Sequence, residues 1–303
     1  MNHKAGFVAI IGYPNVGKST LSNALVGERL SVTTHKAQTT RHRIKGIVSG
    51  EDFQIVYSDT PGILKPGYLL HRSMMSAVFS ALADADIILL MTEPGLEFRQ
   101  EEVLEKIRTS GKPVIVAINK IDKKEDQVIL AESQKWTTVL PGATILTISA
   151  LKRIGLDLLM NAILDHLPES PPYFPKDDLT DLSERFFVSE IIREKILLNY
   201  SDEIPYNAEV SINEFKERKK GEEDIVYLMA SIYVARESQK AIILGKGGSA
   251  IKKLGTDARK EIEAFVGKHV FLELTVKVEK NWRENERSLR RFGYLPPEEE
   301  PGG

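Results

Sequence analysis

A glycine-rich segment near the start of the chain has the residues that bind nucleotide phosphates. The segment GYPNVGKST places Gly12 and Gly17 around a short turn, and Lys18 and Ser19 follow directly. Such glycines let backbone N–H groups turn inward around phosphate oxygens, and a following helix presents its positive N-terminus to them. The lysine can reach the β- and γ-phosphates, and the serine hydroxyl can bind Mg²⁺. The alternative is a glycine-rich turn without a ligand, but the whole motif and its strand–helix setting favour a phosphate site.

Three short segments further along could complete a guanine-nucleotide site. In DTPG, Asp59 is expected to hold Mg²⁺ through water, and the N–H of Gly62 to contact the γ-phosphate. In NKID, the carboxylate of Asp122 can accept hydrogen bonds from the N1–H and N2–H₂ groups of guanine. Adenine offers no such donor pair and would leave that carboxylate desolvated and unpaired. In SAL, at 149–151, a backbone N–H can meet O6 of guanine.

Each of these segments is weak evidence alone, because a solvated loop is the ordinary explanation of a short motif. Together, in this order and each after a predicted strand, they favour a guanine-nucleotide site, since ligands bind at the carboxyl ends of strands in such sheets. The residues expected to contact GTP are Gly12, Tyr13, Pro14, Asn15, Val16, Gly17, Lys18, Ser19, Thr20, Asp59, Thr60, Pro61, Gly62, Ile63, Asn119, Lys120, Asp122, Ser149, Ala150 and Leu151.

A second segment rich in glycine and lysine, GKGG at 245–248, has a different spacing. No serine or threonine directly follows Lys246, and helical patterns flank the segment on both sides. A tight turn of this kind lets the sugar–phosphate chain of a single-stranded nucleic acid approach, while Ile242, Ile243 and Ile251 can line a groove for unstacked bases. The alternative is a turn that only joins two helices, because the GxxG motif is common.

Basic and aromatic residues near the end of the chain agree with an RNA ligand. Arginines at 283, 287, 290 and 291 recur at helical spacing, and Trp282, Phe292 and Tyr294 beside them could stack on bases. A solvated helix face is the alternative interpretation of these arginines. The residues predicted to contact RNA are Ile242, Ile243, Gly245, Lys246, Gly247, Gly248, Lys252, Lys253, Arg283, Arg287 and Arg290.

Residues 1–167 alternate apolar runs with helical patterns and are expected to form one domain. Strands are expected at 7–11, 44–49, 53–58, 86–92, 113–118 and 143–148, with helices over stretches such as 21–26, 69–83, 100–109 and 156–167. The turn at 50–52 is too short for a crossover, so its two strands should be antiparallel. The rest predicts an α/β fold, a mostly parallel sheet with helices on both faces.

A stretch rich in proline, residues 168–183, is predicted to be a fairly stiff linker to a second domain at 184–303. The order in this domain is α-β-β-α-α-β, an α+β layer. It is expected from a helix at 186–200, strands at 208–215 and 225–234 around the charged turn KERKKGEED, helices at 237–244 and 249–266, and a strand at 269–278. A short helix and a frayed acidic tail should end the chain.

Composition excludes several other functions. The chain has 303 residues, a formal net charge of −2 and no cysteine, so bulk charge predicts neither a nucleic-acid binder nor a membrane binder. The lack of cysteine excludes disulfides, thiolate metal sites and cysteine nucleophiles. No apolar stretch approaches the roughly 20 residues that cross a bilayer. The chain is therefore expected to be soluble and cytoplasmic.

The order and spacing of the nucleotide motifs resemble the Ras-like GTPases of the translation-factor class. The resemblance implies slow, Mg²⁺-dependent hydrolysis of GTP and two switch loops, at 31–43 and from Asp59 to about Tyr68. It implies that Thr40 is the second hydroxyl ligand of Mg²⁺, with Thr39 as the alternative, and that Lys18, Thr40 and Gly62 act in catalysis.

At two residues the chain resembles one subgroup of these GTPases. Ile63 stands where many members have the glutamine that orients the attacking water, and an isoleucine can neither hold a water nor accept a proton. Asn15 resembles an asparagine of the subgroup that binds K⁺ beside the phosphates, although it could equally be a plain turn residue. The resemblance implies Mg²⁺ and possible K⁺ as cofactors.

The second half resembles a KH domain of type II, on the GKGG turn and its flanks. The two halves together resemble a family of essential bacterial GTPases that carry a C-terminal KH domain. The resemblance implies that the partners are the 3′ end of 16S rRNA and the 30S subunit, with maturation of the 30S particle as the role, peripheral contact with the inner membrane, and no stable protein partner. A tRNA-modification or transport GTPase, and an RNA-binding protein whose nucleotide only stabilises the fold, are the alternatives.

Overall fold

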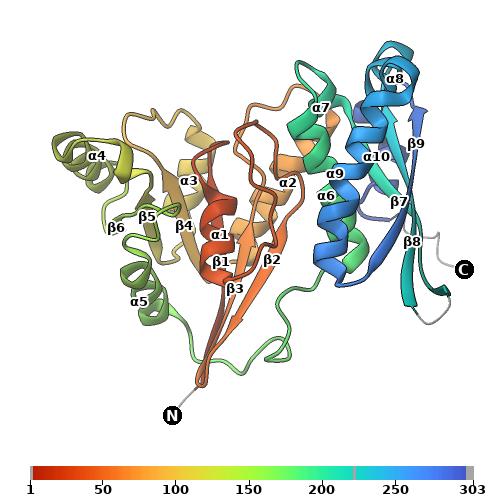
Figure 1. Ribbon diagram of the computed structural model, residues 1–303. Helices are drawn as coiled ribbons and strands as arrows, with labels where there is room; N and C mark the ends of the chain where they lie inside the picture. The colour runs from red at the N-terminus through yellow and green to blue at the C-terminus, as the bar shows by residue number, and fades with distance from the viewer. Residues whose placement is uncertain (1–2, 221–222, 298–303) are drawn as a thin grey trace, which may run out of the picture. The chain divides into compact units, whose positions relative to one another are not determined.

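The computed structural model describes residues 3–220 and 223–297, which divide into two compact units (Figure 1). The first unit comprises residues 1–66 and 74–181, and the second comprises 67–73 and 182–303. The acidic residues 298–300 of the expected tail lie outside the described residues. In the part of the chain that is described, no helix is both long and apolar enough to span a membrane.

The described residues of the first unit form a six-stranded sheet in the order β2-β3-β1-β4-β5-β6. Its strands are β1 (Lys4–Gly12), β2 (Ile44–Ser49), β3 (Phe53–Asp59), β4 (Ile87–Thr92), β5 (Val114–Ile118) and β6 (Thr144–Thr147). Neighbouring strands are parallel except β2 and β3, which are antiparallel. The mostly parallel α/β fold and its one antiparallel pair are therefore confirmed.

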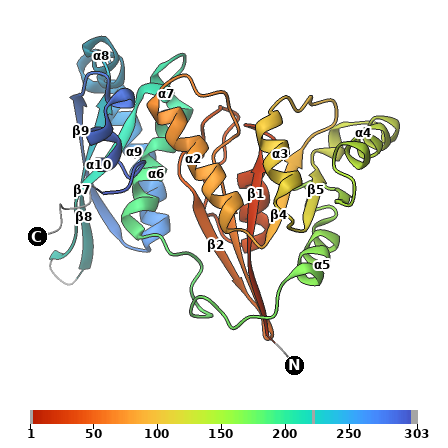
Figure 2. The same ribbon diagram turned by 180° about the vertical axis from the view of Figure 1, so that it is seen from behind.

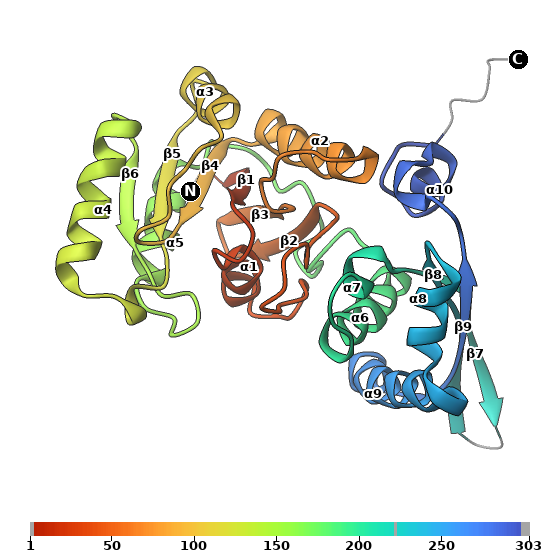
Figure 3. The same cartoon turned by 90° about the horizontal axis from the view of Figure 1, so that it is seen from above.

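Helices cover both faces of this sheet (Figures 2 and 3). One face packs on α1 (Lys18–Val26) and α5 (Leu156–His166). The other packs on α2 (Leu69–Asp84), α3 (Glu101–Thr109) and α4 (Asp126–Val139). β1 and β4 contribute alternate residues to the two faces, as in Ile10 and Ile11, so both strands read as continuous apolar runs. The loops that follow β1, β3 and β5 thus leave the sheet at a common edge.

The second unit has a three-stranded sheet in its described residues, with β8 between β7 and β9. The strands are β7 (Glu209–Lys220), β8 (Glu223–Val234) and β9 (His269–Val278); β7 is antiparallel and β9 parallel to β8. Helices α6 (Glu184–Asn199), α8 (Glu237–Leu244) and α9 (Ser249–Val266) pack on one face and enclose the core (Figure 3). The predicted α-β-β-α-α-β layer is confirmed, and so is the short helix after it, α10 (Glu286–Arg291); the short helix α7 (Ile204–Asn207) was not predicted.

The prediction of a charged turn over residues 216–224 is mostly wrong. β7 continues to Lys220 and β8 begins at Glu223, so most of this segment is a two-stranded ribbon. Lys216 and Arg218 on this ribbon are exposed. An exposed ribbon needs no alternation of apolar and polar residues, which is why the sequence pattern did not reveal it.

Candidate functional site

The glycine-rich loop after β1 closes around the side chain of Lys18. Gly17 has a φ of 102° and caps the N-terminus of α1 in the left-handed region, where glycine is favoured. The lysine side chain is buried, and its Nζ donates to the carbonyl oxygens of Gly12 at 3.1 Å and Tyr13 at 3.0 Å. The loop thus places a cation and the positive end of a helix at the same point, which suits a phosphate group.

Lys18 faces a buried carboxylate, that of Asp59 at the end of β3. Burial lowers the pKa of Lys18 to about 8, against the opposing effect of the Asp59 charge. Burial likewise raises the pKa of Asp59, while the charge of Lys18 lowers it. Neither carboxylate oxygen of Asp59 has a hydrogen bond of good geometry, although the nearby hydroxyl groups of Ser31 and Ser19 also lower its pKa. An unsatisfied buried carboxylate at this position has unused capacity for a hydrated cation.

Two hydroxyl groups beside Asp59 have the spacing of adjacent ligands on one small cation. The Oγ of Ser19 and the Oγ1 of Thr40 are 2.8 Å apart. Adjacent ligands of octahedral Mg²⁺, each at about 2.0–2.1 Å from the ion, lie roughly 2.9 Å apart. Thr39 is used differently, since its hydroxyl bonds Thr34 Oγ1 at 2.9 Å and the carbonyl of Lys36 at 2.6 Å. The geometry therefore favours Thr40 over Thr39.

The NKID and SAL segments are joined to the phosphate loop by Asn119. Its side-chain nitrogen donates to the carbonyl of Val16 at 2.8 Å, and its side-chain oxygen accepts from the N–H of Ala150 at 2.9 Å. A Cβ on Gly17 would lie 2.3 Å from the same amide nitrogen, so this approach requires glycine. Three segments that are far apart in the sequence are thus held as one site.

Asp122 is held ready to accept hydrogen bonds. Ser149 Oγ donates to its Oδ1 at 2.6 Å, and this bond is the main reason that the pKa of the carboxyl is lowered. Asp122 is exposed, so its carboxylate is accessible to a ligand. Lys120, with a left-handed φ of 63°, forms an ion pair with Glu93, which follows β4. The sequence motifs gave no indication of Glu93.

Two of the residues predicted to contact GTP are turned away from the site. The Ile63 side chain is fully buried in the core, and its N–H donates to the Gly12 carbonyl at 3.0 Å. Thr60 is also fully buried, and its hydroxyl donates to the carbonyl of Ile10 at 2.8 Å. Both residues fasten the loop after β3 to β1, so a contact of either with GTP would come from the backbone and not from the side chain. Gly62 does lie against the phosphate loop, since a Cβ there would be 2.7 Å from the Pro14 ring.

Asn15 is exposed at the tip of the phosphate loop, in the left-handed region with a φ of 64°. Its side-chain nitrogen donates to the carbonyl oxygen of His35 at 3.1 Å. His35 belongs to the predicted first switch loop. Asn15 therefore connects the phosphate loop with that switch.

Three glycines of the GKGG turn in the second unit have a positive φ, a backbone conformation that favours glycine. Gly245, Gly247 and Gly248 have φ values of 71°, 60° and 78°. A Cβ on Gly245 would lie 2.9 Å from the backbone nitrogen of Ala250, so α8 and α9 could not approach each other closely with a larger residue there. The turn leaves Lys246 exposed beside it.

The flanks of the turn differ in part from the prediction. Ile242 is 51% exposed, whereas Ile243 is completely buried in the core of the second unit. The inclusion of Ile243 among the RNA contacts was therefore wrong, because its side chain points into the domain. Lys252 is exposed, but Lys253 is bound at 2.6 Å to Asp257, which neutralises much of its charge.

The aromatic residues at the end of the chain are structural. Trp282 is completely buried, and its Nε1 donates to the carbonyl of Asn207 at 3.0 Å. Phe292 packs on the edge of this indole at 5.5 Å between centroids, and the Tyr294 hydroxyl bonds Glu209 at 2.5 Å. Trp282 cannot stack on a base, because it fills the interior.

The arginines of this segment do not form one continuous helical face. A 3₁₀ turn (Trp282–Glu284) contains Arg283, and α10 begins only at Glu286, so this arginine is offset from the others. Arg290 is 3.2 Å from Glu286, which partly neutralises it. Arg287 is exposed. Of the three arginines predicted to contact RNA, Arg287 is the best placed to meet a ligand.

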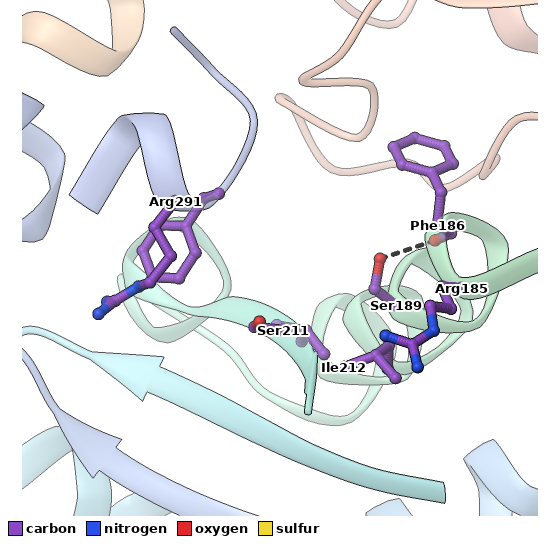
Figure 4. A pocket seen from close by; sticks show the side chains of 8 residues that line it. Arg185, Phe186, Ser189, Ser211, Ile212 and Arg291 are labelled. Carbon is purple, nitrogen blue, oxygen red and sulfur yellow. Dashed lines mark hydrogen bonds between the residues drawn. The ribbon is translucent and has the colours of Figure 1, made fainter. Parts of the chain in front are cut away.

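A separate cavity of about 160 Å³ lies in the second unit between α6, β7 and α10. Figure 4 shows Arg185 and Ile212 on one side of it and Arg291 on the other. The Ser189 hydroxyl donates to the Phe186 carbonyl at 2.7 Å within its wall. None of the residues predicted to contact RNA lines this cavity.

Comparison with family models agrees with the division of functions along the chain. Residues 7–120 match the model of a 50S ribosome-binding GTPase, and residues 203–283 match the model of a KH domain. Relatives resemble the chain over nearly its full length. It is 43% identical over 293 residues to the GTPase Era of Geotalea uraniireducens, covering 96% of this chain and 98% of that protein. The identity to the GTPase Era of Syntrophus aciditrophicus is also 43%, covering 96% and 95%.

Two solved structures are similar to the whole chain. A crystal structure of Era in complex with MgGDPNP and nucleotides 1506–1542 of 16S ribosomal RNA has a TM-score of 0.92 and 41% identity, covering 96% of this chain and 99% of that one. A variant of Era from Aquifex aeolicus bound to GDP·AlF₄⁻ has a TM-score of 0.90 and 41% identity, with the same coverage.

Proposed function

Because this chain belongs to the family of the bacterial GTPase Era, we propose that it is a GTP-dependent switch that binds the 3′ end of 16S ribosomal RNA during assembly of the 30S subunit. The chain is a GTPase with a KH domain. The proposal rests mainly on Asn119, which joins the phosphate loop to the segments that would read guanine. The same chain also presents a GKGG turn in its second unit.

GTP hydrolysis in this site rests on positioning and on charge. Lys18 would exchange its two carbonyl partners for phosphate oxygens, and the N–H of Gly62 would contact the γ-phosphate. Mg²⁺, which a relative contains with GDPNP, would be held here by Ser19, Thr40 and, through water, Asp59, and would neutralise charge between the β- and γ-phosphates. The water-excluding core around Ile63 offers no base, so hydrolysis should be slow without RNA or another activator.

Potassium would supply part of the missing charge stabilisation. The support is Asn15, whose side chain lies at the phosphate loop and touches the backbone of the first switch loop at His35. An amide oxygen and backbone carbonyls are ligands that suit a hard cation. We expect Asn15→Ala to abolish the stimulation of phosphate release by K⁺ over Na⁺, measured as the ratio of the two rates in the same protein. Equal stimulation in the variant and the wild type would exclude this role.

The GKGG turn is proposed to hold the RNA backbone, with Lys246 and Lys252 contributing charge and Ile242 an apolar contact to a base. Gly247→Asp tests this role, since nothing lies within 4 Å of a Cβ at this residue and the added carboxylate would repel phosphate. The variant should lose most of its affinity for a single-stranded 3′-end oligonucleotide while GTP binding stays unchanged. Gly267→Asp, at another left-handed glycine with the same open space, is the matched control. Loss of RNA binding in both variants would contradict the assignment.

Coupling between the two ligands is the remaining part of the proposal. GTP would favour an arrangement that leaves the RNA groove open, and GDP one that occludes it. Such coupling requires that RNA bind the GTP form more tightly, because a ligand shifts an equilibrium only by its differential affinity. A release assay for phosphate separates this switch from an RNA-binding protein whose nucleotide is only structural, which would show no turnover with K⁺ and RNA. Cytoplasmic location and contact with the inner membrane stay predictions.

A further inference from the structure

The proline-rich segment of residues 168–181, which we call the linker segment, is bound along its length to the sheet of the first unit. At its start, the N–H of Ala5 donates to the Pro168 carbonyl at 3.1 Å, and the N–H of Ser170 donates to the His3 carbonyl at 3.0 Å. These bonds fasten it to β1. A flexible tether would make no such contacts, so the linker segment has a fixed path here.

The middle of the linker segment is bound by the β2–β3 hairpin. The buried side chain of Gln54 accepts from the N–H groups of Tyr173 at 2.7 Å and Phe174 at 2.9 Å, and donates to the Phe174 carbonyl at 2.9 Å. Lys176 Nζ then donates to the carbonyl oxygens of Gly50 and Glu51, at 3.1 and 2.8 Å. One buried glutamine thus satisfies three backbone groups of the linker segment, which fixes its register on the hairpin.

The end of the linker segment pairs with the outer edge of β2. The N–H of Ile47 donates to the Leu179 carbonyl at 2.8 Å, and Lys45 Nζ lies 2.6 Å from Asp181 Oδ2. β2 has β3 as its neighbour on the other side, so the linker segment covers an edge that would otherwise be open. The two charged side chains are only 29% and 30% exposed, which limits screening by solvent.

This end of the linker segment connects the first switch loop with the second unit by a short path. Thr40, which approaches Ser19 in the Mg²⁺ site, lies five residues before Lys45 in the sequence. Asp181 is the last residue of the first unit, and Leu182 is the first residue of the following part of the second unit. Arg43 lies between Thr40 and Lys45 in the sequence, and its side chain donates to Ser58 Oγ at 3.1 Å. This bond ties the end of the first switch loop to β3.

We propose that the Lys45–Asp181 ion pair transmits the nucleotide state of the first switch loop to the RNA-binding unit. The inference rests on the proposed coupling between GTP and RNA and identifies its mechanical element. When GTP orders the switch at Thr40, the start of β2 takes a defined position, and the ion pair fixes the point at which the chain leaves for the second unit. With GDP the start of β2 is less constrained, and the pair holds that point less firmly.

A purely structural role for the linker segment, covering the β2 edge, predicts a different result. Loss of the ion pair would then lower thermal stability but would leave the ratio of RNA affinities in the two nucleotide states unchanged. The discriminating quantity is therefore that ratio, measured on the full chain by fluorescence anisotropy with a single-stranded oligonucleotide of the 16S rRNA 3′ end. A non-hydrolysable GTP analogue and GDP define the two states.

Asp181→Asn and Lys45→Ala should lower the ratio by about twofold to fivefold, the range expected for a partly exposed ion pair. The charge exchange Lys45→Asp with Asp181→Lys should restore it. Lys176→Ala is the control, because it removes two bonds of the same linker segment that are far from the switch loop. Every variant should still bind both nucleotides, so that both states can be saturated for the comparison.

A ratio that is unchanged in both single variants would overturn the proposal, and so would an equal decrease in Lys176→Ala or a failure of the charge exchange to restore it. If the wild-type ratio is itself one, the coupling between GTP and RNA fails, and the ion pair has nothing to transmit. The melting temperature of each variant reports separately on the structural contribution of the linker segment.

Discussion

The lowered pKa of Lys18 predicts how nucleotide affinity should change with pH. Burial brings the pKa of this lysine from 10.5 down to about 8 in the nucleotide-free protein. The negative charge of bound phosphates favours the ammonium form and should raise that pKa again. Binding above pH 8 must therefore take up a proton, and affinity should fall as pH rises.

The magnitude follows from the fraction of charged lysine. Between pH 7 and pH 9 that fraction falls from about nine-tenths to about one-tenth, so the Kd for GDP should rise roughly tenfold. Isothermal titration calorimetry at pH 9 in buffers of different ionisation enthalpy should detect uptake of close to one proton. The reasoning would be refuted by a Kd for GDP that is constant between pH 7 and pH 9.

GMP is the control for this experiment, because it has the same base and lacks the β- and γ-phosphates that Lys18 is expected to contact. Its affinity should change much less over the same range. An equal loss of GMP affinity would instead assign the effect to ionisation at the guanine site.

Three further predictions concern the base site and the second unit. Asp122→Asn should weaken GTP roughly 10- to 100-fold and favour xanthosine triphosphate, whose C2 carbonyl can accept from the new amide; competition binding with both nucleotides checks this, and an unchanged preference for guanine contradicts it. Asn119→Ala leaves two buried backbone groups unpaired and should destabilise the nucleotide-free first unit by about 2–5 kcal/mol; chemical denaturation measures the loss, and a change below about 0.5 kcal/mol would argue against the joining role. Trp282→Ala should lower the free energy of unfolding of the second unit by about 3–5 kcal/mol, while GTP binding persists. A variant of unchanged stability that binds RNA poorly would instead show that this indole contacts RNA.

The sequence was most informative where chemistry restricts the choice of residue. The phosphate loop needs glycine at a positive φ, as at Gly17, and a guanine site needs a carboxylate, as at Asp122, so both sites could be proposed from residue type and order. The antiparallel β2–β3 pair was predictable because a three-residue turn permits no crossover. Each of these inferences depends on local geometry that few residues satisfy.

The sequence was least informative about which side of an element faces the interior. Ile242 and Ile243 are identical neighbours, yet one is half-exposed and the other fully buried, and only the packing of α8 on the sheet decides between them. Trp282 has the residue type expected of a stacking surface, but its N–H finds a partner inside the second unit. Glu93 was missed because its partner, Lys120, is distant in sequence. The path of the linker segment was hidden for the same reason, since Gln54 lies far from the prolines that it holds.

The most direct test of the central claim, that one chain couples GTP to RNA, is the affinity of the wild-type protein for the 3′-end oligonucleotide of 16S rRNA in its two nucleotide states. Saturating Mg²⁺ and either GDP or a non-hydrolysable GTP analogue would define those states, at one fixed salt concentration because RNA affinity depends strongly on salt. The account predicts a clearly smaller Kd with the GTP analogue. Identical affinities in the two states would contradict it, because two ligands that do not affect each other's binding are not coupled.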